Sequence, residues 1–329
     1  MIKRIAVFGC KNTTQFLLRN LVIHTKIDQI ITIDEEKGRT MQVADYINIQ
    51  LFGEENNIPV YVAKKYSLKS QEDIEAIIGM NIDIAFVIGW QRIIPAEILS
   101  SFGIGAFGMH GSSMNLPLGR GRSPMNWAII EGREVFYTNL FKYDPGVDSG
   151  DILDTVKFQV TANDTGGTMH FKNVLSMKYL IEKNLPLLRD EAFTLTKQRA
   201  DIEPTYYPKR TPKNGLIDWS QDVINVERLI RAVTRPFDGA YSFINSNRIN
   251  IFASQILDQF EFGYEKSLEG TVLEVFNDAN FLVKCFGGLL LITEWEGEYQ
   301  PKVGDRFDNG DETVQYFKTN DLGFYDLPE

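Results

Sequence analysis

His110 and Asp148 are the two residues of this chain whose types best suit proton-transfer chemistry. His110 ends an apolar segment, and Asp148 lies in an acidic, glycine-containing turn that follows the extended run 135–143. The two residues are far apart in sequence, but two adjacent strands of one sheet could bring them together. An imidazole beside a carboxylate can act as a general acid or base at a carbonyl group. We therefore treat residues 107–149 as the candidate catalytic stretch.

The elements around this stretch alternate between strand-like and helix-like patterns. Strands are expected at 5–8, 30–33, 59–62 and 82–89, and helices at 13–21, 39–48 and 71–78. A long helix is expected to begin at Asp164 or Thr165 and to run to about residue 188. This alternation predicts βαβ units and an α/β fold, with a Rossmann-like, mainly parallel sheet covered by helices on both faces. Ligands of such sheets bind at the carboxyl ends of the strands.

The last third of the chain has a different pattern. The proline-interrupted segment 204–214 is the predicted linker between a catalytic domain of residues 1–203 and a C-terminal domain of residues 215–329. The C-terminal domain is expected to begin with a helix that contains Val223 and Val233. Short strands are then expected at 241–244, 249–256, 270–276, 281–285 and 289–296. Strands of this length and spacing predict a small barrel.

Composition and charge exclude several classes of protein. The apolar fraction of 43% and the charged fraction of 24% are those of an ordinary globular protein. The net charge is −10, and the sequence contains no long cluster of Lys and Arg residues, which argues against a nucleic-acid partner.

Cys10 and Cys285 lie far apart in the sequence without a partner motif, so we expect buried thiols and neither a disulfide nor a metal site. No apolar run approaches the roughly 20 residues that span a bilayer, and we expect a cytoplasmic protein.

The motifs of the catalytic stretch resemble those of the folate-dependent formyltransferase family. That family's signature is Asn-x-His, a short Leu-Pro and Arg-Gly loop, and an Asp-Ala/Ser-Gly-Asp turn. The matching residues are Gly108-Met109-His110, Leu116-Pro117, Arg120-Gly121-Arg122-Ser123-Pro124 and Asp148-Ser149-Gly150-Asp151. A lone histidine with a distant aspartate would more often be a packed core residue, and the ordered set of motifs is what favours catalysis. One position departs from the family, because Gly108 stands where the asparagine belongs.

The C-terminal part of the chain carries a second resemblance. Residues 217–219 and 235–240 are similar to the C-terminal domain of the methionyl-tRNA formyltransferases. This resemblance implies an open β-barrel of the OB type, a fold that binds oligonucleotides and oligosaccharides in other proteins.

The resemblance implies formyl transfer from N10-formyltetrahydrofolate to a primary amine. His110 would donate to the oxyanion or shuttle a proton, and Asp148 would accept a proton from the amine. Gly108 cannot supply the amide that normally stabilises the oxyanion, and loss of one such donor costs about 2.7–4 kcal/mol. We predict that Asn115 replaces it, in preference to Asn126, which should lie on the following helix and pack. Ser112 and Ser113 are further candidate donors.

Cofactor and substrate contacts follow from the same resemblance. The family's folate lies between the loop after the fourth strand and the loop that bears the aspartate, here 88–95 and 143–147. The predicted cofactor-binding residues, acting mainly through the backbone, are Ile88, Gly89, Trp90, Arg92, Ile93, Tyr143, Asp144 and Val147. The predicted substrate-binding residues are Lys11, Asn12, Ser112, Arg120 and Arg122, with Lys65 also available for a diphosphate. The turn that holds Asn12 could bind a phosphate at a helix start.

Two amines are compatible with the resemblance: the aminoacyl end of initiator tRNA and the amino group of a nucleotide-linked aminodeoxysugar. The acidic net charge and the absence of a basic insertion favour the sugar. UDP is favoured over dTDP or GDP as the nucleotide, although no residue decides among them, and the product class serves polysaccharide biosynthesis. The alternatives are a catalytically impaired nucleotide-sugar-binding homologue and a methionyl-tRNA formyltransferase. A homodimer is compatible with the sequence.

Overall fold

The computed structural model describes residues 3–277 and 279–325. The chain divides into two compact units. Unit 1 contains residues 1–120, 137–157 and 172–204, and unit 2 contains 121–136, 158–171 and 205–329. The last boundary between the units, after residue 204, falls in the predicted linker. Two earlier segments, 121–136 and 158–171, belong to the same unit as the C-terminal part of the chain.

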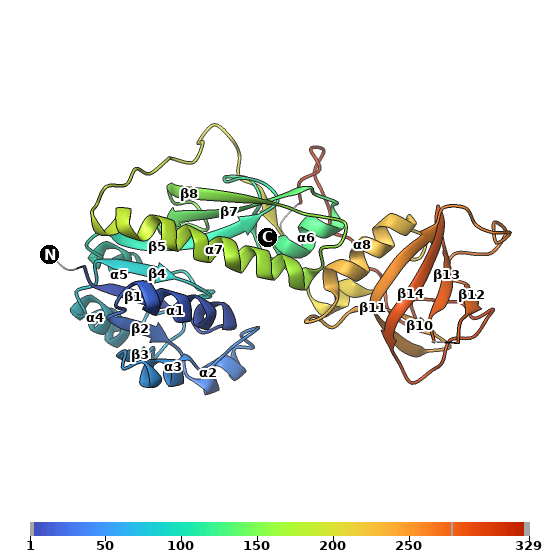
Figure 1. Cartoon of the computed structure of the whole chain (residues 1–329), viewed down its shortest axis with the longest axis horizontal. Helices are drawn as coiled ribbons and strands as arrows, with labels where there is room; N and C mark the ends of the chain where they lie inside the picture. Colours follow the sequence, from blue (N-terminus) through green and yellow to red (C-terminus); the bar gives the residue numbers. More distant parts are fainter. Residues whose placement is uncertain (1–2, 278, 326–329) are drawn as a thin grey trace. The chain divides into compact units, whose positions relative to one another are not determined.

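A seven-stranded, mainly parallel sheet is the framework of unit 1, with the order β3-β2-β1-β4-β5-β7-β8 (Figure 1). Its strands are β1 (Ile5–Phe8), β2 (Gln29–Thr32), β3 (Val60–Val62), β4 (Ile84–Val87), β5 (Gly105–Ser112), β7 (Val135–Lys142) and β8 (Ile152–Gln159). The pairs from β3 to β5 are parallel, and β7 joins β5 antiparallel. The predicted Rossmann-like sheet is therefore confirmed.

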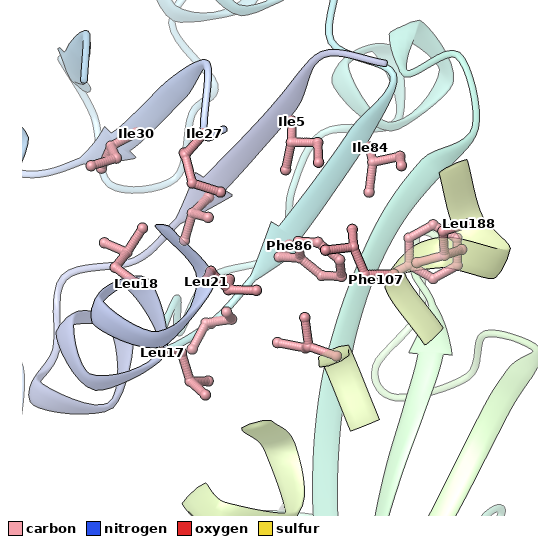
Figure 2. Packing of buried hydrophobic residues seen from close by; sticks show 14 of the residues in the cluster. Ile5, Leu17, Leu18, Leu21, Ile27, Ile30, Ile84, Phe86, Phe107 and Leu188 are labelled. Carbon is pink, nitrogen blue, oxygen red and sulfur yellow. The ribbon is translucent and has the colours of Figure 1, made fainter. Parts of the chain in front are cut away.

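Helices cover both faces of this sheet. They are α1 (Asn12–His24), α2 (Glu35–Thr40), α3 (Ile49–Glu55), α4 (Gln71–Gly79), α5 (Ala96–Ser101) and α7 (Gly166–Arg189). Side chains alternate along each strand, so Val7 packs with α1 and α7 on one face while Phe8 packs with α4 and α5 on the other. Figure 2 shows the first of these cores, in which Leu17 of α1 and Leu188 of α7 join Phe86 of β4. Burial of each such side chain contributes about 1.5–3 kcal/mol to the stability of the folded state.

One helix prediction was wrong. Residues 39–48 were expected to be helical, but α2 ends at Thr40 and α3 begins only at Ile49. Gln42 and Asp45 adopt φ angles of 47° and 60°, which an α-helix does not tolerate. The connection between the two short helices is therefore a series of turns.

A five-stranded antiparallel sheet, with the order β10-β11-β14-β13-β12, forms the core of unit 2. Its strands are β10 (Ala240–Ile244), β11 (Asn247–Asp258), β12 (Val272–Val275), β13 (Phe281–Cys285) and β14 (Gly288–Glu296). The remaining short elements of the chain are β6 (Arg120–Gly121), α6 (Pro124–Ile130), β9 (Tyr206–Tyr207) and η1 (Pro212–Gly215). Helix α8 (Val223–Val233) packs Val226 and Ile230 into the sheet's core. The five predicted strands are confirmed, and the classification as an OB-type barrel stays a prediction.

Neither cysteine forms a disulfide, and both thiols are buried. Burial raises the pKa of Cys10, and it raises the pKa of Cys285 to about 12. Within residues 3–277 and 279–325, no helix has the length and apolar character needed to cross a bilayer. The same residues contain no cluster of three or more side chains able to hold a metal ion.

Candidate active site

The structure brings His110 and Asp148 together within unit 1. His110 lies on β5, which pairs with β7, and Asp148 follows β7. The imidazole Nδ1 lies 3.4 Å from Oδ2 of Asp148, while Nε2 lies 2.8 Å from the carbonyl oxygen of Gly119. Both ring nitrogens therefore face oxygen atoms that accept hydrogen bonds. The predicted spatial pairing is confirmed, and the catalytic roles of the two residues stay predictions.

Gly119 fixes the second contact of the imidazole. Its φ is +70°, and a β-carbon at this position would lie 2.2 Å from Oγ of Ser112. Only glycine fits such a position, so the carbonyl group remains aimed at His110. Ser112 is fully buried and its hydroxyl accepts the N–H of Met114 at 3.3 Å. Ser112 thus supports the loop, and its contact with substrate stays a prediction.

Gln198 holds the turn that carries Asp148. Its Nε2 donates to the carbonyl oxygens of Asp148 and Gly150, both at 2.8 Å. Arg120, only 8% exposed, donates to Oε1 of Gln198 at 2.8 Å. Asp148 itself has a φ of 51°, a left-handed conformation that aspartate tolerates better than most residues. Gln198 was missed in the sequence because a bond to backbone carbonyls leaves no motif.

The predicted oxyanion donors lie in different environments. Asn115 is exposed, and its Oδ1 accepts the N–H of Leu116 at 3.1 Å within a turn. Ser113 is 9% exposed. Asn126 lies on α6 in unit 2, where its Nδ2 donates to the carbonyl oxygen of Ala232 at 2.7 Å. The expectation that Asn126 packs on a helix is confirmed, while donation by Asn115 stays a prediction.

The first predicted cofactor loop follows β4 and is anchored at two points. The Thr14 hydroxyl donates to the carbonyl oxygen of Ile88 at 2.7 Å, and the N–H of Gln91 donates to the Tyr66 hydroxyl at 3.0 Å. Trp90 is buried with its ring edge-on to Tyr66 at a centroid distance of 4.8 Å. The indole Nε1 has no acceptor among the described residues.

The remaining residues predicted to bind the cofactor are more exposed. Ile93 is 55% exposed, and the guanidinium of Arg92 lies 5.0 Å from the centroid of the Tyr66 ring. On the second loop, Val147 is 49% exposed and Oδ1 of Asp144 accepts the N–H of Gly146 at 3.0 Å. Each loop therefore presents one large exposed hydrophobic side chain, Ile93 on the first and Val147 on the second. Gly89 and Tyr143 lie on the same two loops.

The predicted substrate-binding residues are dispersed. Lys11 and Asn12 lie at the start of α1, close to the loop after β4 that Thr14 anchors. The backbone N–H of Lys65 donates to Asp73 at 2.9 Å. Arg122 is exposed and belongs to unit 2. Binding by these residues stays a prediction.

Two cavities lie within unit 2, and neither is lined by a predicted catalytic residue. Their volumes are about 1120 Å³ and 370 Å³. The larger is lined by Arg133, Arg228 and Arg231 together with Glu134 and Glu227. Its charged lining groups are guanidinium and carboxylate groups, and no histidine is among the described residues that line it. We therefore place the candidate active site at the His110–Asp148 pair.

The fold and the site together define an α/β protein with a histidine–aspartate pair at β5 and the turn after β7. Residues 3–176 match the model of the formyl transferase family, and residues 209–310 match that of the formyl transferase C-terminal domain. The chain therefore belongs to the formyl transferase family.

Known proteins resemble the chain to different extents. The bifunctional polymyxin resistance protein ArnA of Wigglesworthia glossinidia brevipalpis is 32% identical over 201 residues, 61% of this chain and 30% of ArnA. The chain thus corresponds to less than a third of that relative's length. The N-formyltransferase from Helicobacter canadensis superposes with a TM-score of 0.64 at 19% identity, covering 90% of this chain and 100% of that one. HypX from Aquifex aeolicus gives a TM-score of 0.62 at 17% identity, covering 91% of this chain and 46% of HypX. These structures support the fold.

Proposed function

We propose that this protein transfers a formyl group from N10-formyltetrahydrofolate to the amino group of a nucleotide-linked aminodeoxysugar. The observation that carries the proposal is the His110–Asp148 pair at 3.4 Å in a chain of the formyl transferase family. The Helicobacter canadensis enzyme supports the choice of substrates, since it was solved with folinic acid and dTDP-3-aminofucose. The sequence favoured UDP, and we propose that the nucleotide is UDP or dTDP.

The residues of the two loops fit a folate. A pterin is a flat ring with an amide-rich edge, and such rings bind between apolar walls with a few polar contacts. Ile93 and Val147 supply exposed apolar surface, one from each loop. Trp90 adds a buried N–H donor that lacks an acceptor among the described residues. When bound, the folate would supply the formyl carbon.

The proton balance of the reaction assigns roles to the pair. The C–N bond to the donor breaks, a C–N bond to the sugar forms, and one proton moves from the amine to the departing nitrogen. The Asp148 side chain is 21% exposed, so its carboxylate can accept the amine proton. Asp148 would then pass this proton to the departing nitrogen, while His110, whose Nδ1 contacts the carboxylate, stabilises it during the transfer. Lys11 and Asn12, at the start of α1, are the proposed diphosphate contacts, because Arg120 is buried against Gln198.

The test is release of tetrahydrofolate in the presence of UDP-linked and dTDP-linked amino sugars. Release that equals the loss of free amine supports the proposal, and His110→Ala should abolish it. Binding of these nucleotide sugars without release would favour the impaired binding homologue. Release with charged initiator tRNA, and with none of the sugars, would favour the methionyl-tRNA formyltransferase.

Replacing Gln198 by alanine is expected to lower kcat by about 10-fold to 100-fold, because a small displacement of Asp148 weakens a positioned acid–base pair. Gln198 contacts the backbone of the turn and would not touch substrate, so KM should change little. Steady-state tetrahydrofolate release measures both constants. Gln71→Ala, an exposed glutamine on α4, is the matched control. A normal kcat in Gln198→Ala would show that the turn keeps its geometry without this side chain.

A further inference from the structure

We propose that the phenol hydroxyl of Tyr143 donates the hydrogen bond that stabilises the developing charge on the formyl oxygen. The hydroxyl would thereby replace the side-chain amide that Gly108 lacks. This inference rests on the proposed function and assigns a catalytic residue to it. Tyr143 was predicted to lie on a cofactor loop, and Asn115 was predicted to be the donor.

Gly108 marks the place where a donor is missing. It lies on β5 two residues before His110, so the two positions share one face of the strand. A β-carbon at Gly108 would lie 2.2 Å from Cε1 and 2.7 Å from Oη of Tyr143. These distances are far below van der Waals contact. The phenol of Tyr143 therefore occupies the volume that a side chain at position 108 would take.

The strand register explains how Tyr143 reaches this place. Gly108 pairs with Phe141 on β7, and directly opposite residues project from the same face of a sheet. Tyr143 follows two residues later on that face, where its N–H donates to the carbonyl oxygen of Ala106 at 2.8 Å. Its ring stacks on that of Phe141, with centroids 5.2 Å apart and planes 22° from parallel. Backbone and ring contacts thus hold the hydroxyl beside Gly108.

The other polar groups near His110 are placed less well than the Tyr143 hydroxyl to take the place of a side chain at Gly108. The two nitrogens of His110 face Gly119 and Asp148. Asn139 lies directly opposite His110 on β7 and is fully buried, and its Nδ2 has no acceptor among the described residues. Its Oδ1 accepts the Thr155 hydroxyl at 2.7 Å. Tyr143 is partly buried and lies on the loop that also carries Asp144 and Val147.

The environment of Tyr143 keeps its proton in place. Burial, and then the negative charge of Asp148, raise the pKa of the Tyr143 phenol above its ordinary value. A raised pKa leaves the hydroxyl neutral throughout the pH range in which the amine reacts. Tyr143 therefore acts as a hydrogen-bond donor and gives up no proton. An aimed neutral donor of this kind is what a preorganised oxyanion site requires.

Tyr143→Phe tests this inference because it removes the hydroxyl and keeps the ring over Gly108. We expect kcat to fall by about 10²–10³-fold, the loss found on removing one oxyanion donor, while KM for both substrates stays within a few-fold. Calorimetric binding of folinic acid should be unchanged. Tyr179→Phe, which removes an exposed hydroxyl from α7, is the matched control.

A second pair of variants separates donation from packing. Tyr143→Ala opens the space over Gly108, and Gly108→Asn combined with Tyr143→Ala fills it with an amide donor. We expect the double variant to be faster than Tyr143→Ala alone. Normal kcat in Tyr143→Phe, loss of folinic acid binding in that variant, or a comparable loss of kcat in Asn115→Ala alone would overturn the inference. Absence of turnover in the wild-type protein would instead overturn the proposed function.

Discussion

Replacing His110 by alanine is expected to lower the rate of formyl transfer by about 10⁴-fold, the upper end of the range for a positioned acid–base group. The imidazole contacts the Asp148 carboxylate and the loop carbonyl of Gly119 at once. Without it, the carboxylate loses the partner that stabilises it while the amine proton is transferred. The folded state should persist, since each of the two acceptors left without its partner costs about 1–3 kcal/mol.

Single-turnover release of tetrahydrofolate measures this loss, and thermal unfolding checks the fold. His24→Ala is the matched control, because His24 is an exposed histidine at the end of α1 whose ring pairs with Glu182. A rate in His110→Ala within tenfold of wild type, at saturating substrates, would remove His110 from the mechanism.

Asp148→Asn is expected to lower the rate by about 10³-fold, because an amide cannot accept the proton of the attacking amine. The substitution conserves shape, and Gln198 holds the turn through the backbone carbonyls of residues 148 and 150. The geometry of the turn should therefore survive, and the loss should fall on kcat. Steady-state kinetics in the two substrates separates kcat from KM.

The control for this variant is Asp190→Asn, an exposed aspartate in unit 1. Binding of folinic acid to Asp148→Asn should match that of the wild-type protein. A loss that appeared only in KM would assign Asp148 to substrate binding and leave proton transfer to another group.

Much of the fold could be predicted from local patterns. Alternating strand and helix periods indicate a mainly parallel sheet, because buried parallel strands and their crossover helices leave distinct spacings of apolar residues. The five strands of the C-terminal part of the chain could likewise be predicted from the sequence. The end of α2 at Thr40 was missed, since the positive φ angles of Gln42 and Asp45 arise from turns that no apolar period marks.

The site was predictable only in part. His110 and Asp148 could be recognised because their neighbours form ordered motifs along the chain. Gln198 could not, because it acts from 50 residues downstream through backbone carbonyls. Arg120, expected to contact substrate, is buried against Gln198 in the structure.

The sequence by itself determined which residue types meet in the catalytic stretch and showed that Gly108 lacks a side chain. Only the tertiary structure decided what fills that space. Tyr143 lies over Gly108 because β5 and β7 pair in one register, which places Phe141 opposite Gly108 and Tyr143 two residues further along the same face. A shift of one residue would turn every side chain of β7 to the other face. Register is a property of two strands packed in one sheet, so neither segment alone specifies it.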